Sequence, residues 1–165
     1  MPELTLIAGV ARTGVIGDGE TIPWHYDADE RQYKERVAGH PVVVGRKTHQ
    51  GMTRIEGTHP VVVTSSPDEY EEDDATFVAT VPEAVDAVAQ HGETGWVIGG
   101  QSIYAMFLPY AHRAFVSELP ETATASRVFP YLGTKWAVVD RYGYDEFDVI
   151  EYEQADPLEP ATEST

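Results

Sequence analysis

Short apolar runs alternate with helical patterns along the first two thirds of the chain. The runs are rich in β-branched residues and bounded by turn-forming residues, which predicts buried strands at residues 4–11, 41–45, 60–64 and 96–98. Between the runs, apolar positions and helix-start residues predict helices at residues 27–38, 82–91 and 101–108. Strands that alternate with helices favour a parallel sheet with helices on its faces.

The last third of the chain differs, because its apolar runs are not all separated by helices. These runs predict strands at residues 113–119, 135–140 and 146–152. No helix separates the last two, so we expect them to form an antiparallel hairpin at one edge of the sheet. The sequence therefore predicts a single α/β domain over residues 1–153, with a mixed, mainly parallel β-sheet flanked by helices and an antiparallel C-terminal hairpin. Residues 154–165 are rich in Pro, Glu, Ala, Thr and Ser, and we expect a flexible acidic tail there.

The charge balance is strongly acidic, with 28 Asp and Glu against 11 Lys and Arg and a formal net charge of −17. Such a surface repels nucleic acid phosphates, so we expect no nucleic-acid partner. It is typical of an ordinary acidic protein or of one adapted to molar salt, where a Debye length of about 3 Å screens the self-repulsion. We favour the second interpretation, a halophilic source.

The composition also bears on the compartment. The chain has no cysteine, which excludes a disulfide framework and thiolate chemistry. It contains no run of about 20 apolar residues, as a membrane span needs, and its N-terminus lacks the features of a signal peptide. We therefore expect a cytoplasmic protein with no membrane association. We also expect a monomer.

The segment at residues 22–29, Ile-Pro-Trp-His-Tyr-Asp-Ala-Asp, places a Pro-Trp corner directly before a helix. The first turn of that helix carries three acids, Asp27, Asp29 and Glu30. Acids in this position are stabilised by the helix dipole, and this alone would account for all three.

Helical spacing separates the three acids. Asp29 shares a face with Tyr33 and Val37, at i+4 and i+8, whereas Glu30 and Lys34 form an i,i+4 pair suited to solvent. Asp29 is therefore the acid that we expect to point inward. A carboxylate held against apolar and aromatic side chains is costly, so Asp29 is a candidate functional residue.

Three strand ends carry groups suited to binding phosphate. They are Gly99-Gly100, which would let a phosphate approach the backbone; the cations of Arg46-Lys47-Thr48; and the hydroxyls of Thr64-Ser65-Ser66. Each has an ordinary interpretation, as a strand-to-helix turn or as solvated surface groups. The Gly-x-Gly-x-x-Gly and P-loop spacings are absent from these sites. Together the three ends suggest a dinucleotide with an extra phosphate, beside a buried carboxylate.

The sequence shows little support for a metal site or a catalytic nucleophile. The six histidines form no His-x-x-x-His pair or carboxylate cluster at ligand spacing, and Gly-x-Ser-x-Gly is absent. We expect no metal.

Over residues 4–152 the chain resembles dihydrofolate reductase. The resemblance rests on short motifs that occur in order: Leu6-Ile7-Ala8, Val15-Ile16-Gly17, Pro23-Trp24, Asp29, Gly45-Arg46-Lys47-Thr48, Thr64-Ser65-Ser66, Val97-Ile98-Gly99-Gly100, Ile103-Tyr104, Phe107-Leu108-Pro109 and Phe129-Pro130. Each motif is weak, but their order and spacing are specific. The resemblance implies NADPH-dependent reduction of 7,8-dihydrofolate to tetrahydrofolate, with hydride to the pterin C6 and a proton to N5, in support of one-carbon metabolism.

The resemblance also implies the site residues. Asp29 would bind the pterin 2-amino group and the adjacent ring nitrogen, and Ser117 and Trp24 would complete the catalytic set. The implied substrate-binding residues are Ile7, Ala8, Asp29, Glu30, Tyr33, Lys34, Met52, Arg54, Ile98, Tyr104 and Ser117. The implied NADPH-binding residues are Ala8, Gly9, Ile16, Gly17, Gly45, Arg46, Lys47, Thr48, Thr64, Ser65, Ser66, Ile98, Gly99, Gly100, Gln101, Ser102, Ile103 and Tyr104. Of these, Arg46 and Lys47 would read the 2′-phosphate, which favours NADPH over NADH.

Some positions depart from the pattern of the family, among them Thr58. Thr58 stands where the family generally has an arginine for the substrate's glutamate carboxylate, and Arg54 or Lys34 are the candidates to replace it. Two other functions stay open: a riboflavin-pathway pyrimidine reductase of the same fold, and a non-catalytic binding domain. The Pro-Trp corner before Asp29 argues against the first, and the intact Asp29 and Gly99-Gly100 argue against the second.

Overall fold

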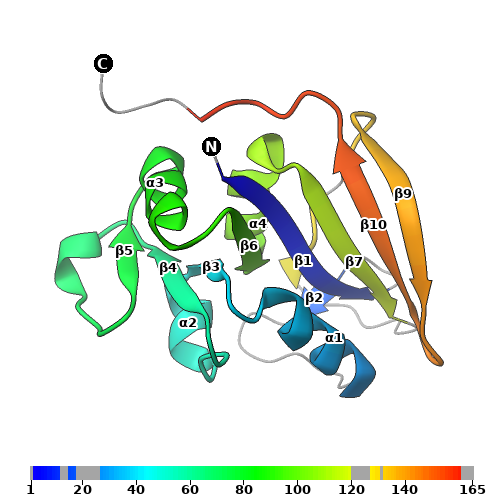
Figure 1. Cartoon of the computed structure of the whole chain (residues 1–165), viewed down its shortest axis with the longest axis horizontal. Helices are drawn as coiled ribbons and strands as arrows, with labels where there is room; N and C mark the ends of the chain where they lie inside the picture. The colour runs from blue at the N-terminus through cyan, green and yellow to red at the C-terminus, as the bar shows by residue number, and fades with distance from the viewer. Residues whose placement is uncertain (1, 12–14, 18–26, 120–126, 131, 161–165) are drawn as a thin grey trace.

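The chain forms one main sheet with helices on both faces (Figure 1). The computed structural model describes residues 2–11, 15–17, 27–119, 127–130 and 132–160. The described strands are β1 (Glu3–Ala11), β2 (Val15–Gly17), β3 (Pro41–Gly45), β4 (His59–Val63), β5 (Thr76–Val78), β6 (Thr94–Gly99), β7 (Arg113–Leu119), β8 (Arg127–Val128), β9 (Trp136–Gly143) and β10 (Asp148–Gln154). The helices are α1 (Asp27–Val37), α2 (Arg46–Gly51), α3 (Val81–His91) and α4 (Gln101–Phe107), with 3-10 turns η1 (Pro67–Glu69) and η2 (Leu108–Tyr110).

The main sheet has eight strands in the order β5-β4-β3-β6-β1-β7-β10-β9. Its strands from β5 to β7 are parallel, and β10 pairs antiparallel with both β7 and β9. Parallel strands covered on both faces need nearly continuous apolar runs, and the valines of β3 and β4 are almost completely buried. The predicted mixed sheet with an antiparallel C-terminal hairpin is confirmed.

Helices cover the two faces with separate apolar clusters. On one face, α3 and α4 pack Ala84, Val88 and Phe107 against the sheet. On the other face, α1 packs Val37 against a cluster that includes Trp96 and Phe115. Figure 1 shows α1 near the carboxyl end of β1.

The parallel pairing brings the carboxyl ends of the central strands to one edge of the sheet. The registers pair Val44 with Gly99 and Gly45 with Val63. The candidate phosphate-binding motifs follow these strand ends, so chain segments far apart in sequence meet at one edge, as expected for ligand sites of open α/β sheets.

Several details differ from the sequence prediction. The short strands β2, β5 and β8 were not expected; β2 and β8 pair as a separate two-stranded sheet. At the end of β10, the Gln154 side chain donates to the backbone oxygen of Ala111 (2.8 Å), and beyond β10 the amide of Leu158 donates to the backbone oxygen of Pro109 (2.9 Å). These bonds tie the first part of the expected tail to the domain. The flexible tail stays a prediction, and residues 161–165 lie outside the described residues.

Within the described ranges, no helix combines the length and the apolar character needed to cross a membrane.

Candidate active site

A carboxylate and a hydroxyl from distant parts of the chain meet at the start of α1. Ser117 on β7 is 1% exposed, and its Oγ donates to Oδ1 of Asp29 at 2.5 Å. The two residues are 88 positions apart, so the fold itself creates the pair. Asp29 is half-buried, which leaves the carboxylate accessible to a ligand. Glu30 and Lys34 form the expected exposed ion pair at 2.7 Å on the neighbouring face of α1.

A third side chain, which was not predicted from the sequence, bonds both members of this pair. Gln32 is 5% exposed, and its Nε2 donates to Oδ1 of Asp29 (3.0 Å) and to Oγ of Ser117 (3.3 Å). Its Oε1 accepts from Nε of Arg36 at 2.7 Å. Helical spacing could have indicated this arrangement, because Gln32 and Arg36 follow Asp29 at i+3 and i+7.

An apolar wall lies beside Asp29 on the α1 face of the sheet. Ile7 and Ile98 are buried in the cluster that Tyr33 and Met52 contact, so the side chains expected to form the pterin and nicotinamide pocket are gathered on this face. Burial raises the pKa of Tyr33 well above its usual value and keeps the phenol neutral.

Ala8 and Tyr104 belong to the cluster on the opposite face of the sheet. The Tyr104 hydroxyl donates to the backbone oxygen of Ile7 at 2.7 Å. Burial, together with Tyr33 and Asp29, raises the pKa of Tyr104 far above its usual value. Tyr104 is therefore a neutral donor that bonds the β1 backbone from the face opposite α1. Its side chain does not line the α1 face.

Glycines at the strand ends form a narrow backbone cradle. A Cβ at Gly45 would lie 3.0 Å from Cγ1 of Ile103, and one at Gly100 would lie 3.3 Å from Oγ1 of Thr48. Gly99 has φ +122°, a conformation that L side chains rarely adopt, and the Gly99-Gly100 peptide bond is cis. Glycine therefore keeps this edge free of side chains, which fits the close approach of a pyrophosphate to the backbone.

Hydroxyl and amide side chains follow the ends of β4 and β6 at the same edge of the sheet. Thr64 is buried, and its Oγ1 accepts from the amide of Ser66 (3.2 Å), whereas Ser65 is exposed. In the first turn of α4, Gln101 is half-buried and Ser102 is exposed. The exposed hydroxyls are free to face a ligand from solvent.

The two adjacent cations at the start of α2 differ in their surroundings. Arg46 is half-buried; its Nη1 donates to Oε1 of Gln50 at 3.0 Å, and its guanidinium lies 5.9 Å from the centre of the Tyr70 ring. Lys47 is exposed. Arg46 is thus partly oriented before any anion binds. The donor set of this edge, two cations with hydroxyls and glycine backbone, fits a dinucleotide that carries an extra phosphate.

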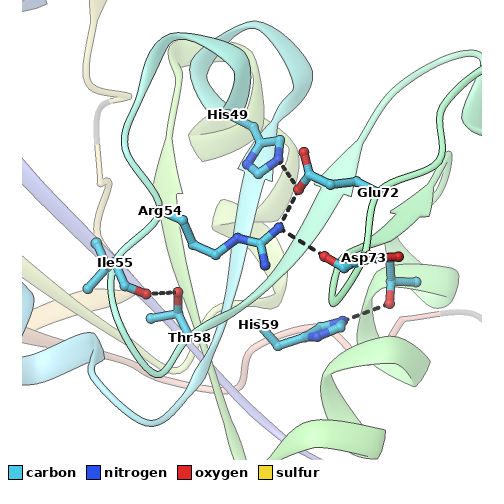
Figure 2. A network of polar contacts seen from close by, with 8 residues as sticks. His49, Arg54, Ile55, Thr58, His59, Glu72 and Asp73 are labelled. Atoms are coloured by element: carbon cyan, nitrogen blue, oxygen red, sulfur yellow. Dashed lines mark hydrogen bonds and ion pairs between the residues drawn. The ribbon is translucent and has the colours of Figure 1, made fainter.

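The cations expected at the far end of the substrate site are already paired. Arg54 forms an ion pair with Glu72 and also donates to the backbone oxygen of Asp73 at 3.2 Å (Figure 2). His49 contacts the same Glu72 oxygen at 2.9 Å. The Thr58 hydroxyl donates to the backbone oxygen of Ile55 at 2.6 Å.

The remaining predicted residues are described only in part or not at all. Trp24 lies outside the described residues. Ile16 and Gly17 belong to β2, and only their backbone is described. Within the part of the chain that the structure covers, no three His, Asp or Glu side chains are grouped to hold a metal ion.

Comparison with known proteins gives a consistent result. The family model for dihydrofolate reductase matches residues 3–155. Among curated proteins from halophilic organisms, dihydrofolate reductase 1 of Haloarcula marismortui is 40% identical over 94% of this chain and 93% of its own length. Dihydrofolate reductase HdrB of Haloferax volcanii is 36% identical over 92% of this chain and 84% of its own.

A solved structure extends the likeness to the fold. The dihydrofolate reductase from Enterococcus faecalis, complexed with NADP(H) and RAB-propyl, superposes with a TM-score of 0.84 at 24% identity, over 93% of this chain and 97% of that one. The family match spans nearly all of the described residues, including the Asp29–Ser117 pair and the glycine cradle. The chain belongs to the dihydrofolate reductase family.

Proposed function

We propose that this protein reduces 7,8-dihydrofolate to 5,6,7,8-tetrahydrofolate with NADPH. The observation that carries the proposal is the half-buried Asp29, bonded to Ser117 and facing the same side of the sheet as an apolar wall. A carboxylate in this setting suits the amidine-like edge of a pterin, from which it can accept two parallel hydrogen bonds.

In this proposal the protein binds, orients and shields the reacting groups. NADPH, when bound, supplies the hydride that reaches the pterin C6. Asp29 holds the pterin by its 2-amino group and ring nitrogen and favours protonation at N5, with water as the proton carrier. The apolar side chains of Ile7 and Ile98 exclude other water from the pterin face.

The glycine cradle supports the cofactor part of the proposal. Gly45, Gly99 and Gly100 let the pyrophosphate approach the backbone, and Thr48 adds a hydroxyl next to Gly100. Arg46 and Lys47 would pair with the 2′-phosphate, which distinguishes NADPH from NADH.

The cellular setting is part of the same proposal. The protein would act in the cytoplasm as a monomer and supply tetrahydrofolate for one-carbon metabolism. Its partner would be the substrate dihydrofolate. We expect no nucleic-acid partner, since a net charge of −17 disfavours binding of a nucleic acid.

The test is oxidation of NADPH with dihydrofolate by the purified chain, both in molar salt and without it. Wild type is expected to turn over, and Asp29→Asn is expected to lose about 100-fold or more at neutral pH, because the amide cannot stabilise the developing positive charge on the pterin. Asp27→Asn is the matched control, since Asp27 is an exposed acid of the same helical turn.

Three results would contradict the proposal. Absence of turnover by wild type at every salt concentration would refute the activity, and turnover of a pyrimidine substrate instead would favour the riboflavin-pathway reductase. Full activity of Asp29→Asn at neutral pH would refute the role of Asp29.

A further inference from the structure

A chain of three side chains on α1 runs from the candidate active site to the far end of the helix. Asp29, Gln32 and Arg36 are linked by hydrogen bonds of 3.0 Å and 2.7 Å. Gln32 is 5% exposed, so its amide bonds are made away from bulk water, where their loss is costly.

The orientation of the Gln32 amide follows from the chemistry of Arg36. A guanidinium has only donors, so Arg36 can bond only the oxygen of the amide. The amide nitrogen must then face Asp29 and Ser117, to which it donates at 3.0 Å and 3.3 Å. With Arg36 absent, the amide could rotate and present its oxygen to the carboxylate, which would repel it.

Arg36 is itself held by aromatic rings from the sheet. Its guanidinium carbon lies 4.5 Å from the centre of the Phe115 ring and 4.9 Å from that of Tyr142. The Tyr142 hydroxyl donates to Glu151 at 2.8 Å, which fixes this ring in turn. The network therefore connects Asp29 to β7, β9 and β10.

Within the described residues, Ser117 and Gln32 donate to the same oxygen of Asp29. Ser117 and Gln32 converge on Oδ1, and two donors on one oxygen set the rotation of the carboxylate about its Cβ–Cγ bond. Ser117 alone would leave that rotation less restrained.

We propose that Gln32 and Arg36 are positioning residues for the reductase: Arg36 fixes the amide of Gln32, and Gln32 fixes the rotation of the Asp29 carboxylate that receives the pterin. This inference rests on the proposed function, because it concerns how Asp29 meets that substrate. Neither residue touches the cofactor cradle, so their effects fall on the pterin side of the reaction.

The ionisable groups around Asp29 limit the interpretation of a pH profile. Tyr33 on α1 and Tyr104 on α4 both have a pKa raised well above the usual value by burial, so neither titrates near neutral pH. On the far side of Arg36, the hydrogen bond to Glu151 raises the pKa of Tyr142 to about 12. A change in the acid limb of activity therefore does not come from any of these three tyrosines.

The first experiment compares Gln32→Leu, Arg36→Met and the double variant with wild type. We expect kcat/KM for dihydrofolate to fall about tenfold in Gln32→Leu and about threefold in Arg36→Met, with the double variant no worse than Gln32→Leu, since Arg36 acts through Gln32. The dissociation constant for NADPH should not change. Arg31→Met, which removes an exposed arginine from the same helix, is the matched control.

The second experiment uses Gln32→Glu, which keeps an acceptor for Arg36 but places a second carboxylate beside Asp29. Like charges at this distance favour shared protonation, so the acid limb of kcat/KM should move up by about two pH units, against about half a unit for Gln32→Leu. A purely structural role would lower the thermal midpoint without moving this limb.

The outcomes separate the inference from the proposed function. If wild type is inactive, the proposed function fails. If wild type is active and Gln32→Leu and Gln32→Glu keep both its kcat/KM and its acid limb, the positioning role is refuted. Additive losses in the double variant would refute the order Arg36–Gln32–Asp29, and weaker NADPH binding would refute a positioning role confined to the pterin side.

Discussion

Gly9 lies so close to Asp29 that the Cβ of an alanine at this position would sit 2.9 Å from Oδ2 of the carboxylate. The same Cβ would lie 3.3 Å from Cδ1 of Leu119. Position 9 is thus closed to any side chain unless Asp29 moves.

We therefore expect Gly9→Ala to displace the carboxylate and lower kcat/KM for dihydrofolate by about tenfold to 100-fold, since small misplacements of a binding group are costly. Gly51→Ala is the control, because a Cβ at Gly51 would meet no atom within 4 Å. Steady-state kinetics of both variants, with thermal midpoints, test the prediction. It is wrong if Gly9→Ala keeps wild-type kcat/KM.

Much of the sheet could be predicted because its strands are buried on both faces. The valine runs at residues 42–44 and 61–63 are nearly inaccessible to solvent, and such runs leave a clear pattern in the sequence. The strands β2, β5 and β8 were missed because two or three residues are too few to show a period.

The candidate site was predictable where the helical face was apolar. Tyr33 and Val37 indicated which acid of the first turn points inward, and Asp29 does meet Ser117. Gln32 was missed because a glutamine on a polar helix is usually solvated, and its burial depends on Ser117 and Arg36 arriving from other turns and strands. Contacts of that kind depend on the assembled fold rather than on local pattern.

A second prediction concerns the preference for NADPH. Arg46 is partly oriented by Gln50 and Tyr70, whereas Lys47 is exposed, so Arg46 loses less conformational freedom on binding a phosphate. We expect Arg46→Met to lower the ratio of kcat/KM for NADPH to that for NADH by about tenfold or more, and Lys47→Met by only about threefold. An equal effect of the two substitutions, or a matching loss with NADH, would contradict this assignment.

A third prediction concerns stability and pH. The rings of His59 and His91 stack with centres 3.6 Å apart, and His59 contacts Oγ1 of Thr76 at 2.8 Å (Figure 2). Burial, His91 and Arg54 lower the pKa of His59 from its usual 6.5. The unfolded chain therefore binds more protons than the folded one just below that value, and stability should fall as the pH drops from about 7.5 to about 5.5.

His91→Asn tests the electrostatic share of this effect. It removes one of the charges that oppose protonation of His59, so the loss of stability over the same pH window should become smaller. The urea midpoint at one fixed salt concentration is the measurement. Glu72, whose pKa is lowered by hydrogen bonds from His49 and Arg54, acts in the same direction only at lower pH, below its usual 4.5. An unchanged slope in His91→Asn would exclude the histidine pair as the cause.

A fourth prediction concerns salt. Both proposed ligands are anions, and they approach a chain with a formal net charge of −17. Added salt shortens the range of this repulsion to about 3 Å near 1 M, so KM for NADPH should fall and turnover should rise between about 0.1 M and about 1 M KCl. At higher salt the specific ion pairs with the phosphates become screened and the gain should stop. A steady loss of activity from zero to molar KCl would contradict adaptation to high salt.

The last prediction concerns the glutamate end of the substrate. Arg54 is paired with Glu72, Lys34 is paired with Glu30, and the Thr58 hydroxyl is bonded to a backbone oxygen. Since each cation already has a carboxylate partner, a second carboxylate gains little from either one.

Wild type should therefore prefer dihydrofolate over dihydropteroate, which lacks the glutamate, by less than about fivefold in kcat/KM. Glu72→Gln removes the charge that competes for Arg54, and this variant should prefer dihydrofolate more strongly than wild type does. Glu71→Gln is the matched control, because Glu71 is the exposed neighbour of Glu72. A preference of 100-fold or so in wild type, abolished by Arg54→Met, would instead assign the substrate carboxylate to Arg54 despite its ion pair with Glu72.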